Sequence, residues 1–408
     1  MKLLTSEQLR LVFESLDANP RVVASGNFAT PQALLSLFDS VVPEYRLHIL
    51  NAQPGIPDRE GVTYESAFVG AGMRLHPRLN YVPCRLSLVP VLFRDHFAPD
   101  VVLLHTSTVR TGKVSLGTEV NVLPAAIEAA RARGAIVVAQ ANPQMPYTFG
   151  DAEISLDDID FIIDADEPLA VMPAHKPNDI SAEVGRLISA KVTDGSTLQL
   201  GIGEIPDAVI EQLHSRRDLR IFTEMFSDGV LGLDRAGALD AEVAITASFV
   251  FGSTELYEWL HLNERVKMLR TETTNEPGLI ARQTKMTSIN AALEVDLFDQ
   301  ANASRVRGEI YSGWGGSTDF IVGALHSRGG QSFMALPSWH AKANVSTIVP
   351  RLTDPVTSFQ HSYVVTEQGV ADCFGHTQAE QAQNIIGQAA HPSVRDELTA
   401  AAHDMGLF

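Results

Sequence analysis

A predicted strand that runs into two glycines is the first segment with residue types suited to chemistry. In L-Q-L-G-I-G-E-I-P, which begins at Leu198, the strand leads into Gly201-Ile202-Gly203 and a predicted helix follows. Glycine lets the backbone approach a ligand closely, and the N–H groups of the turn and of the first helical turn point outward. Such amides are suited to an anion or an oxyanion. A plain strand-to-helix turn would have the same pattern.

A carboxylate ends the next predicted strand. In I-F-T-E-M-F-S-D-G-V, Glu224 lies 21 positions after Gly203, on what should be the neighbouring strand. Because ligands bind beyond the carboxyl ends of parallel strands, its carboxylate is expected to face the same crevice as the glycine turn. A solvated strand-end glutamate is the alternative without a function. A dinucleotide-binding fingerprint combines similar features, but Pro206 replaces its third glycine, which argues against that interpretation.

Three later segments carry further candidate residues. In S-G-W-G-G-S-T-D-F, Gly315 and Gly316 precede a predicted helix, so exposed amides are again available, and Asp319 falls in its first turn. Glu367 ends the predicted strand of Y-V-V-T-E, and Lys342, in a predicted loop before a strand, is a candidate contact for a phosphate. Tight turns and solvated side chains are the structural alternatives. The scattered histidines and the acidic segment D-A-E-I-S-L-D-D lack metal-ligand spacing, so no metal site is predicted.

The elements that must position these residues alternate along the chain. Predicted strands include R-V-V-A-S-G, P-D-V-V-L-L-H and A-I-V-V-A-Q-A in the first half, and T-L-Q-L-G-I, I-F-T-E and I-N-A-A-L-E-V-D in the second. Helical stretches between them predict an α/β fold in which helices cover parallel sheets in both halves. A stretch rich in proline and polar residues, from Pro168 to Pro177, is the predicted linker. It divides the chain into predicted domains 1–175 and 176–408.

The composition restricts the class of partner. The 408 residues are 45% hydrophobic, and 49 acidic against 31 basic residues give a net charge of −18. This charge disfavours nucleic acids and anionic membranes, because both are bound through clustered Lys and Arg. Cys84 and Cys373 lie far apart without a ligand pattern, which suits a reducing compartment. The N-terminus lacks an apolar signal-peptide core, and no apolar run reaches the ~20 residues of a membrane span. A cytoplasmic protein is therefore expected.

Eight motifs follow one another along the chain: V-S-L-G-T-E-V-N, N-P-Q-M-P-Y-T-F-G-D, L-G-I-G-E-I-P, T-E-M-F-S-D-G-V, I-N-A-A-L-E-V-D, G-G-S-T-D-F, A-K-A-N-V-S-T-I-V-P and V-T-E-Q-G-V-A-D. Taken in order, they resemble those of the acetyl-CoA hydrolase/transferase family, especially its 4-hydroxybutyrate CoA-transferase branch. The resemblance spans almost the whole chain. It implies two similar α/β/α open-sheet domains of the CoA-transferase, NagB-like type, commonly in homodimers.

The resemblance also implies a role for each candidate residue. Glu224 matches the catalytic glutamate, and Asn275 resembles an active-site asparagine. Glu367 matches an auxiliary glutamate. The residues implied to bind CoA or to donate oxyanion amides are Gly201, Ile202, Gly203, Glu204, Ile205, Gly315, Gly316 and Lys342. The first-half segment T-S-T-V-R-T-G-K-V-S-L-G departs from the usual pattern, and since first-half loops line the acyl pocket, the substrate stays open.

The expected reaction is CoA transfer from a short-chain acyl-CoA to a carboxylic acid, through a thioester on Glu224. It uses CoA as a substrate and no metal or redox cofactor. The partners expected are acyl-CoA and a short-chain carboxylate, without nucleic acid or membrane. Hydrolysis of acyl-CoA by the same glutamate is the first alternative. An NAD-dependent dehydrogenase and a catalytically silent CoA-ester sensor are the others.

Overall fold

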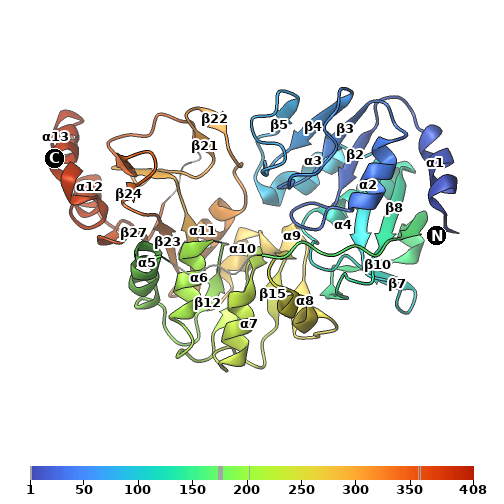
Figure 1. The fold of residues 1–408 in the computed structure, drawn as a ribbon. Helices are drawn as coiled ribbons and strands as arrows, with labels where there is room; N and C mark the ends of the chain where they lie inside the picture. Colours follow the sequence, from blue (N-terminus) through green and yellow to red (C-terminus); the bar gives the residue numbers. More distant parts are fainter. Residues whose placement is uncertain (1, 173–177, 202, 357, 359) are drawn as a thin grey trace. The chain divides into compact units, whose positions relative to one another are not determined.

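The chain folds into two compact units. The computed structural model describes residues 2–172, 178–201, 203–356, 358 and 360–408 (Figure 1). The N-terminal unit comprises Met1–Pro173, Thr246–Thr274 and Glu309–Gly315, and the C-terminal unit comprises Ala174–Ile245, Asn275–Gly308 and Gly316–Phe408. Two segments from the second half of the chain thus belong to the first unit. The predicted domains, 1–175 and 176–408, are contiguous and place both segments in the second domain. Of the predicted linker, residues 173–177 lie outside the described residues.

A parallel sheet forms the centre of the N-terminal unit. Within the described ranges it has eight strands in the order β1-β11-β8-β6-β2-β3-β4-β5, and neighbouring strands run parallel. The strands are β1 Lys2–Leu3, β2 Arg21–Ala24, β3 Tyr45–His48, β4 Val62–Ser66, β5 Leu79–Tyr81, β6 Val101–Thr106, β8 Ile136–Ala141 and β11 Phe161–Asp164. The residues of β6, V-V-L-L-H-T, are buried throughout, as expected for a strand covered on both faces.

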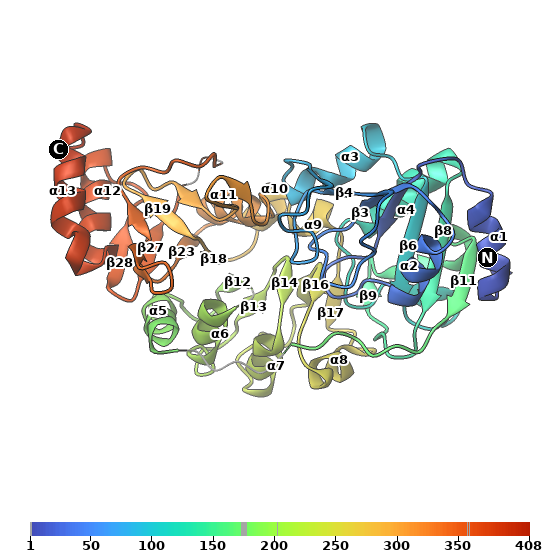
Figure 2. The same cartoon turned by 45° about the horizontal axis from the view of Figure 1, so that its top comes forward.

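Helices cover both faces of this sheet (Figure 2). On one face, Leu9 and Phe13 of one helix and Phe38 of the next share a core with strand residues such as Val101. On the other face, the ring of Phe93 packs 5.1 Å from that of His48. The helices are α1 Ser6–Glu14, α2 Gln32–Asp39, α3 Val89–Asp95 and α4 Leu123–Arg133. The shorter elements are β7 Lys113–Ser115, β9 Phe149–Gly150, β10 Glu153–Ser155, β17 Val266–Met268, α8 Thr254–Leu260 and α9 Thr271–Thr274.

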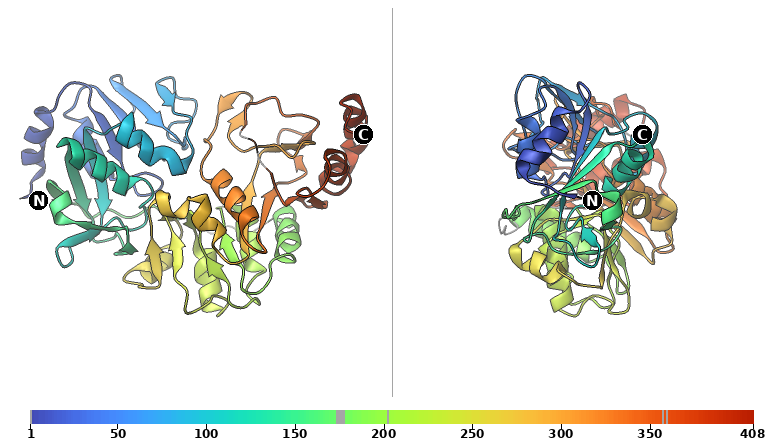
Figure 3. Two further views of the ribbon diagram at one scale, coloured as in Figure 1. Left: turned by 180° about the vertical axis from the view of Figure 1, so that it is seen from behind. Right: turned by 90° about the vertical axis from the view of Figure 1, so that its right-hand side faces the viewer.

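The C-terminal unit has a second open sheet (Figure 3). In the part of the chain that the structure describes, its order is β13-β12-β18-β23-β27-β28, parallel up to β27, with β28 antiparallel to it. The strands are β12 Thr197–Gln199, β13 Arg220–Ile221, β18 Met286–Ala291, β23 Gln331–Ala335, β27 Tyr363–Thr366 and β28 Gly369–Asp372. The helices are α5 Asp179–Ser189, α6 Glu204–Glu211, α7 Asp228–Arg235, α10 Pro277–Ala281, α11 Ser317–His326, α12 Gln378–Asn384 and α13 Arg395–Asp404. The predicted α/β fold with parallel, helix-covered sheets is confirmed.

One predicted strand of this unit is wrong. The segment I-N-A-A-L-E-V-D divides, because β18 ends at Ala291 and β19 (Glu294–Asp296) joins a separate small sheet. There it pairs antiparallel with β20 (Ala301–Asn302) and parallel with β26 (Ile348–Val349). The apolar pattern of the sequence continues from β18 into β19, so it does not reveal that the two strands pair in different sheets. Within the described ranges, no helix combines the length and apolar character needed to cross a bilayer.

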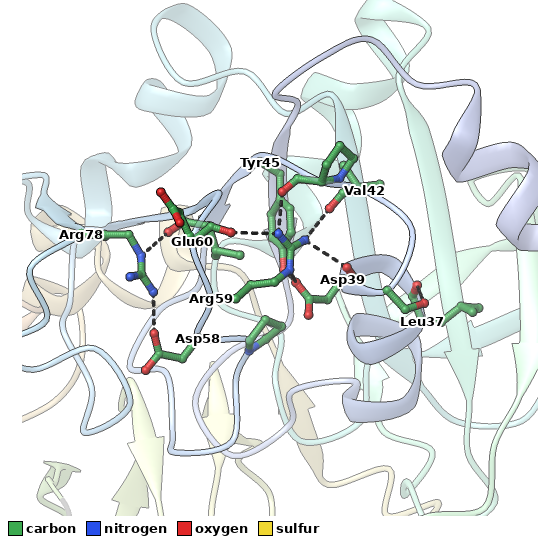
Figure 4. Close-up of polar contacts among 12 residues, drawn as sticks. Leu37, Asp39, Val42, Tyr45, Asp58, Arg59, Glu60 and Arg78 are labelled. Atoms are coloured by element: carbon green, nitrogen blue, oxygen red, sulfur yellow. Dashed lines mark hydrogen bonds and ion pairs between the residues drawn. The ribbon is translucent and has the colours of Figure 1, made fainter.

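Arg59 clamps the turn between α2 and β3 (Figure 4). Its Nε donates to Asp39 Oδ1 at 2.9 Å, and Tyr45 Oη donates to the same oxygen at 2.8 Å. Its Nη2 donates to the carbonyl oxygens of Asp39 and Val42 at 3.0 and 2.5 Å. Its Nη1 donates to the carbonyl oxygen of Glu60 at 3.0 Å. The guanidinium therefore satisfies carbonyls of a turn that lacks ladder partners.

Replacing Arg59 with lysine is expected to lower the free energy of unfolding by ~2–3 kcal/mol. Lysine keeps the charge but lacks the planar fork, so most of the carbonyl bonds are lost at about 1 kcal/mol each. The midpoint of urea unfolding measures the loss. Arg94→Lys is the matched control, because the side chain of Arg94 is 71% exposed and bonds to the neighbouring Asp95. Equal midpoints for both variants would contradict the clamp.

Candidate active site

Two segments that follow neighbouring strands meet beside Glu224. The predicted pairing is confirmed, since β12 and β13 are parallel neighbours. Beyond them, Thr223 Oγ1 accepts from the Leu200 N–H at 3.2 Å and lies 3.1 Å from the Leu200 carbonyl oxygen, to which it donates. Leu200 also forms an antiparallel bridge with Met225. Gly201, which follows Leu200, therefore lies at the same edge of the sheet as Glu224.

The sequence predicted that Glu224 ends a strand, and this prediction is wrong. β13 ends at Ile221, and Glu224 lies in a bend directly before β14 (Met225–Phe226). The Met225 carbonyl oxygen lies 2.9 Å from the Thr223 hydroxyl and is the alternative acceptor for its single proton, so this hydroxyl takes the place of a regular ladder at this point. The resulting bend frees the Glu224 side chain from the alternation of a strand.

The Glu224 carboxylate is held between an amide and a glycine. Asn275, which is fully buried, donates from Nδ2 to Glu224 Oε2 at 2.9 Å. Gly316 precedes α11, and a Cβ atom added to it would lie 2.0 Å from Glu224 Oε2 and 2.1 Å from Asn275 Nδ2. Such distances are far below any van der Waals contact. The absence of a side chain at Gly316 is therefore what allows the carboxylate to lie there.

The environment of Glu224 favours its neutral form. Burial raises its pKa to about 7, the hydrogen bond from Asn275 lowers it, and the charge of Asp319 raises it. Asp319 lies in the first turn of α11 and is 2% exposed. Glu224 therefore titrates near neutral pH, a property more common at functional sites than at surfaces.

Glu224→Gln is expected to stabilise the fold at pH 8 and to leave it unchanged at pH 4. The pKa rises from 4.5 in the unfolded chain to about 7 in the fold, so the unfolded chain binds fewer protons between these values. Stability therefore falls as pH rises through this window. The neutral glutamine avoids that loss, worth about 3 kcal/mol at most. Thermal unfolding at both pH values measures the gain, and an unchanged melting temperature at pH 8 would contradict the raised pKa.

The glycine turn before α6 leaves backbone amides available. Gly203 has φ +122° and precedes Glu204 and Ile205, the first two residues of α6, whose N–H groups lack intrahelical partners. The Glu204 carboxylate accepts from Ser181 Oγ at 3.1 Å, at the start of α5. Among the described residues, a Cβ atom added to Gly201 would meet one side-chain atom, at 3.7 Å, so these residues leave space beside it. Ile202 lies outside the described residues.

The remaining predicted residues lie in other settings. Gly315 belongs to the N-terminal unit, has φ +58°, and accepts from the Leu86 N–H at 3.0 Å. Lys342 is exposed in the turn between β24 (Trp339–His340) and β25 (Val345–Ser346), so the predicted loop is the tip of a hairpin.

Glu367 lies in the turn between β27 and β28, where its carboxylate contacts the loop before β24. It accepts from the Ser338 N–H at 2.9 Å, from Ser338 Oγ, and from Gln368 Nε2 at 3.0 Å. Burial favours the neutral acid, but these hydrogen bonds outweigh it and hold the pKa of Glu367 below its ordinary value.

The structure thus groups the predicted residues into two sets in the C-terminal unit. Glu224, Asn275 and Gly316 lie together beside the glycine turn, and Glu367 is joined to the start of the Lys342 hairpin. Sequence reasoning missed Thr223 and Ser338. A hydroxyl inside a β-branched run is a weak signal for Thr223, and no signal in the sequence marked Ser338.

Comparison with known proteins finds family models and a relative that are all named for CoA transfer or acetyl-CoA hydrolysis. The model of the acetyl-CoA hydrolase/transferase N-terminal domain matches residues 57–173, and that of the C-terminal domain matches residues 252–402. A 4-hydroxybutyrate coenzyme A transferase from Clostridium kluyveri is 34% identical over 97% of this chain and 96% of its own length.

Two solved structures share the fold. The crystal structure of RipA from Yersinia pestis has a TM-score of 0.92 at 29% identity, covering 100% of this chain and 98% of its own. That of a 4-hydroxybutyrate CoA-transferase from Porphyromonas gingivalis has a TM-score of 0.82 at 30% identity, covering 99% and 98%. Because both family models match, and the relative and the two solved structures cover nearly the full length, the chain is an enzyme of the CoA-transferase type and belongs to the acetyl-CoA hydrolase/transferase family.

Proposed function

We propose that this chain transfers CoA between a short-chain acyl-CoA and a carboxylic acid through a covalent thioester on Glu224. The supporting observation is the Glu224 carboxylate, which Asn275 orients and which only a glycine at position 316 accommodates. A carboxylate is a weak nucleophile, so fixed geometry and stabilised charge must supply most of the rate. Acids of the acetate, butyrate and 4-hydroxybutyrate class are the proposed substrates, and 4-hydroxybutyrate is in the names of two of the relatives reported above.

The first half-reaction has two steps on Glu224. Its carboxylate oxygen attacks the thioester carbonyl carbon, the carbon–sulfur bond breaks, and an acyl-glutamyl anhydride and CoA thiolate result. The thiolate then attacks the glutamyl carbonyl carbon, the anhydride C–O bond breaks, and the first acid leaves as a carboxylate. A glutamyl-CoA thioester remains, and an acceptor carboxylate repeats these steps in reverse order.

The surrounding residues have distinct tasks in this proposal. Asn275 holds one carboxylate oxygen, which leaves the other to attack. The amides at the Gly201–Gly203 turn and at the start of α11, after Gly316, are the candidate donors to the tetrahedral oxyanions. The partial burial of Glu224 limits the access of water to the anhydride and the thioester. CoA enters as a substrate, and the residues named here supply the proposed chemistry.

Intact mass spectrometry after incubation with an acyl-CoA tests the proposal. A CoA-sized adduct that peptide mapping assigns to Glu224 is the expected result. Turnover without such an adduct in the wild-type protein would refute it. Release of free CoA with and without acetate then separates transfer from hydrolysis, which the family description also names. Release that is fast without an acceptor would favour the hydrolase.

The rate is expected to rise with pH through about 7, because Glu224 must be ionised to attack. Asp319→Asn removes a negative charge beside it and is expected to move the midpoint of kcat/KM to lower pH. The pH profile of kcat/KM measures both values. Asp404→Asn, at the exposed end of α13, is the control and should leave the profile in place. An unchanged profile in the Asp319 variant would contradict this role.

We also propose that the chain is a cytoplasmic homodimer, as expected from the family. The two cysteines of the sequence, Cys84 and Cys373, are both buried, and so low a cysteine content fits a reducing compartment. Light scattering on the purified protein measures the oligomeric state, and a monomer at micromolar concentration would contradict it.

A further inference from the structure

We propose that Ser338 is a positioning residue, which fastens the hairpin bearing Lys342 to Glu367 and so places the lysine ammonium for the phosphates of CoA. This inference rests on the proposed function, with CoA as a substrate, and on the CoA contact of Lys342 that the family resemblance implies. It assigns Glu367 to holding a binding loop rather than to reacting with the substrate.

Ser338 and Glu367 lie beyond the carboxyl ends of two neighbouring strands. β23 and β27 are parallel, and the Leu336 N–H donates to the Val365 carbonyl oxygen at 3.1 Å just past the end of β23. Two residues later on each segment, Ser338 meets Glu367. Ligands of open parallel sheets bind at this edge. The contact is therefore placed where a binding loop starts.

In this contact, which we call the clasp, the Glu367 carboxylate accepts two hydrogen bonds from Ser338. The Ser338 N–H donates to Glu367 Oε2 at 2.9 Å, and Ser338 Oγ donates to Oε1. Gln368 Nε2 adds a bond to Oε1 at 3.0 Å. Ser338 is fully buried. Both carboxylate oxygens are thus occupied by donors of the protein, and charge-assisted bonds of this kind are the strong ones.

The hairpin above the clasp is internally fixed. Trp339 and His340 pair with Ser346 and Val345. At the tip, the Asn344 N–H donates to the His340 carbonyl oxygen at 2.8 Å, and the Ala343 N–H donates to His340 Nδ1 at 3.0 Å. Lys342 is exposed between these bonds.

With the tip fixed, the base of the hairpin decides where Lys342 lies. Strands of two residues are too short to hold an orientation alone. At the base, the Thr347 N–H donates to the Ser338 carbonyl oxygen at 3.3 Å, and Thr347 Oγ1 donates to the Pro337 carbonyl oxygen at 2.5 Å. The bonds to Glu367 tie this base to the central sheet. Loss of the Ser338 hydroxyl therefore lets the whole hairpin, with Lys342 at its tip, move relative to the central sheet.

The test compares two thioesters, one with and one without the adenosine nucleotide of CoA and its phosphates. Ser338→Ala is expected to raise KM for an acyl-CoA about tenfold, the factor that loss of one charge-assisted bond corresponds to, with kcat unchanged. KM for the matching acyl-pantetheine, which lacks the nucleotide phosphates, should stay the same. Lys342→Ala should show the same split, and the double variant should be no worse than Lys342→Ala alone. Glu367→Gln, which keeps the shape but loses the charge, should follow Ser338→Ala.

Ser332→Ala is the control for removal of a buried serine hydroxyl. Ser332 is fully buried in β23, and its Oγ accepts from the Ser362 N–H at 3.0 Å, so the substitution costs stability away from the hairpin. It should leave both KM values unchanged.

Three results would overturn the proposal. They are equal KM changes for both thioesters, additive effects of Ser338→Ala and Lys342→Ala, or a fall in kcat with KM unchanged. Mass spectrometry of the Glu224 adduct separates this failure from failure of the proposed function. An adduct without the KM pattern refutes the clasp alone, whereas a wild-type protein that turns over without an adduct refutes the thioester mechanism.

Discussion

Glu224→Ala is expected to lower the rate of CoA transfer by a factor on the order of 10⁴ or more. In the proposed mechanism every bond change passes through this carboxylate, so its removal leaves no route through the covalent intermediate. The CoA adduct should also disappear from the mass spectrum. Steady-state rates with acyl-CoA and acetate, together with intact mass, measure both effects.

The control for this variant is an exposed glutamate of the same unit. Glu211→Ala, at the exposed end of α6, should keep the wild-type rate. Glu224→Gln keeps the acceptor for Asn275 and should be as inactive as alanine while unfolding at a higher temperature at pH 8. A Glu224→Ala protein that retains a tenth of the wild-type rate would exclude this residue as the nucleophile.

Gly316→Ala is expected to lower kcat by about 10²- to 10³-fold, the loss that follows from misplacing a reacting group. The φ of −107° and ψ of −1° at Gly316 suit alanine, so the backbone itself accepts the change. The added Cβ, 2.0 Å from Glu224 Oε2, must instead push the carboxylate or Asn275 aside. Steady-state kcat, with the melting temperature beside it, measures the effect.

Gly387→Ala separates this clash from a general effect of adding a methyl group. An added Cβ at Gly387 meets no atom within 4 Å among the described residues. Its activity should match the wild type. Equal activity of the two glycine variants would show that the Glu224 position seen here is not the one used in turnover.

The sequence predicted the part of the site that depends on local pattern. Alternating apolar runs and helices predicted parallel sheets, and the spacing between Gly203 and Glu224 predicted neighbouring strands, because consecutive strands of an α/β unit commonly pair. The bend at Glu224 escaped this reasoning, since it depends on a hydroxyl, that of Thr223, which replaces ladder bonds. The roles of the residues came from the family resemblance and remain proposals.

The rest of the site depends on contacts between distant positions. Asn275 lies 51 positions from Glu224. The hydrogen bond from its side-chain amide to the Glu224 carboxylate can be seen only once α10 and α11 are packed. Ser338 lies 29 positions from Glu367, in a segment without a recognisable motif. The clash distances at Gly316 likewise need coordinates. Periodicity constrains which face a residue occupies, but not which distant side chain it meets.

The inclusion of two later segments in the N-terminal unit has a consequence for synthesis of the chain. β9 pairs with β17, the Val69 N–H donates to the Ser312 carbonyl oxygen, and Leu86 bonds to Gly315. A nascent chain that has left the ribosome only up to Pro173 lacks all of these partners. The N-terminal unit can therefore finish folding only after residue 315 has emerged, while part of the C-terminal unit is already exposed. Chaperone demand should be greatest in that interval.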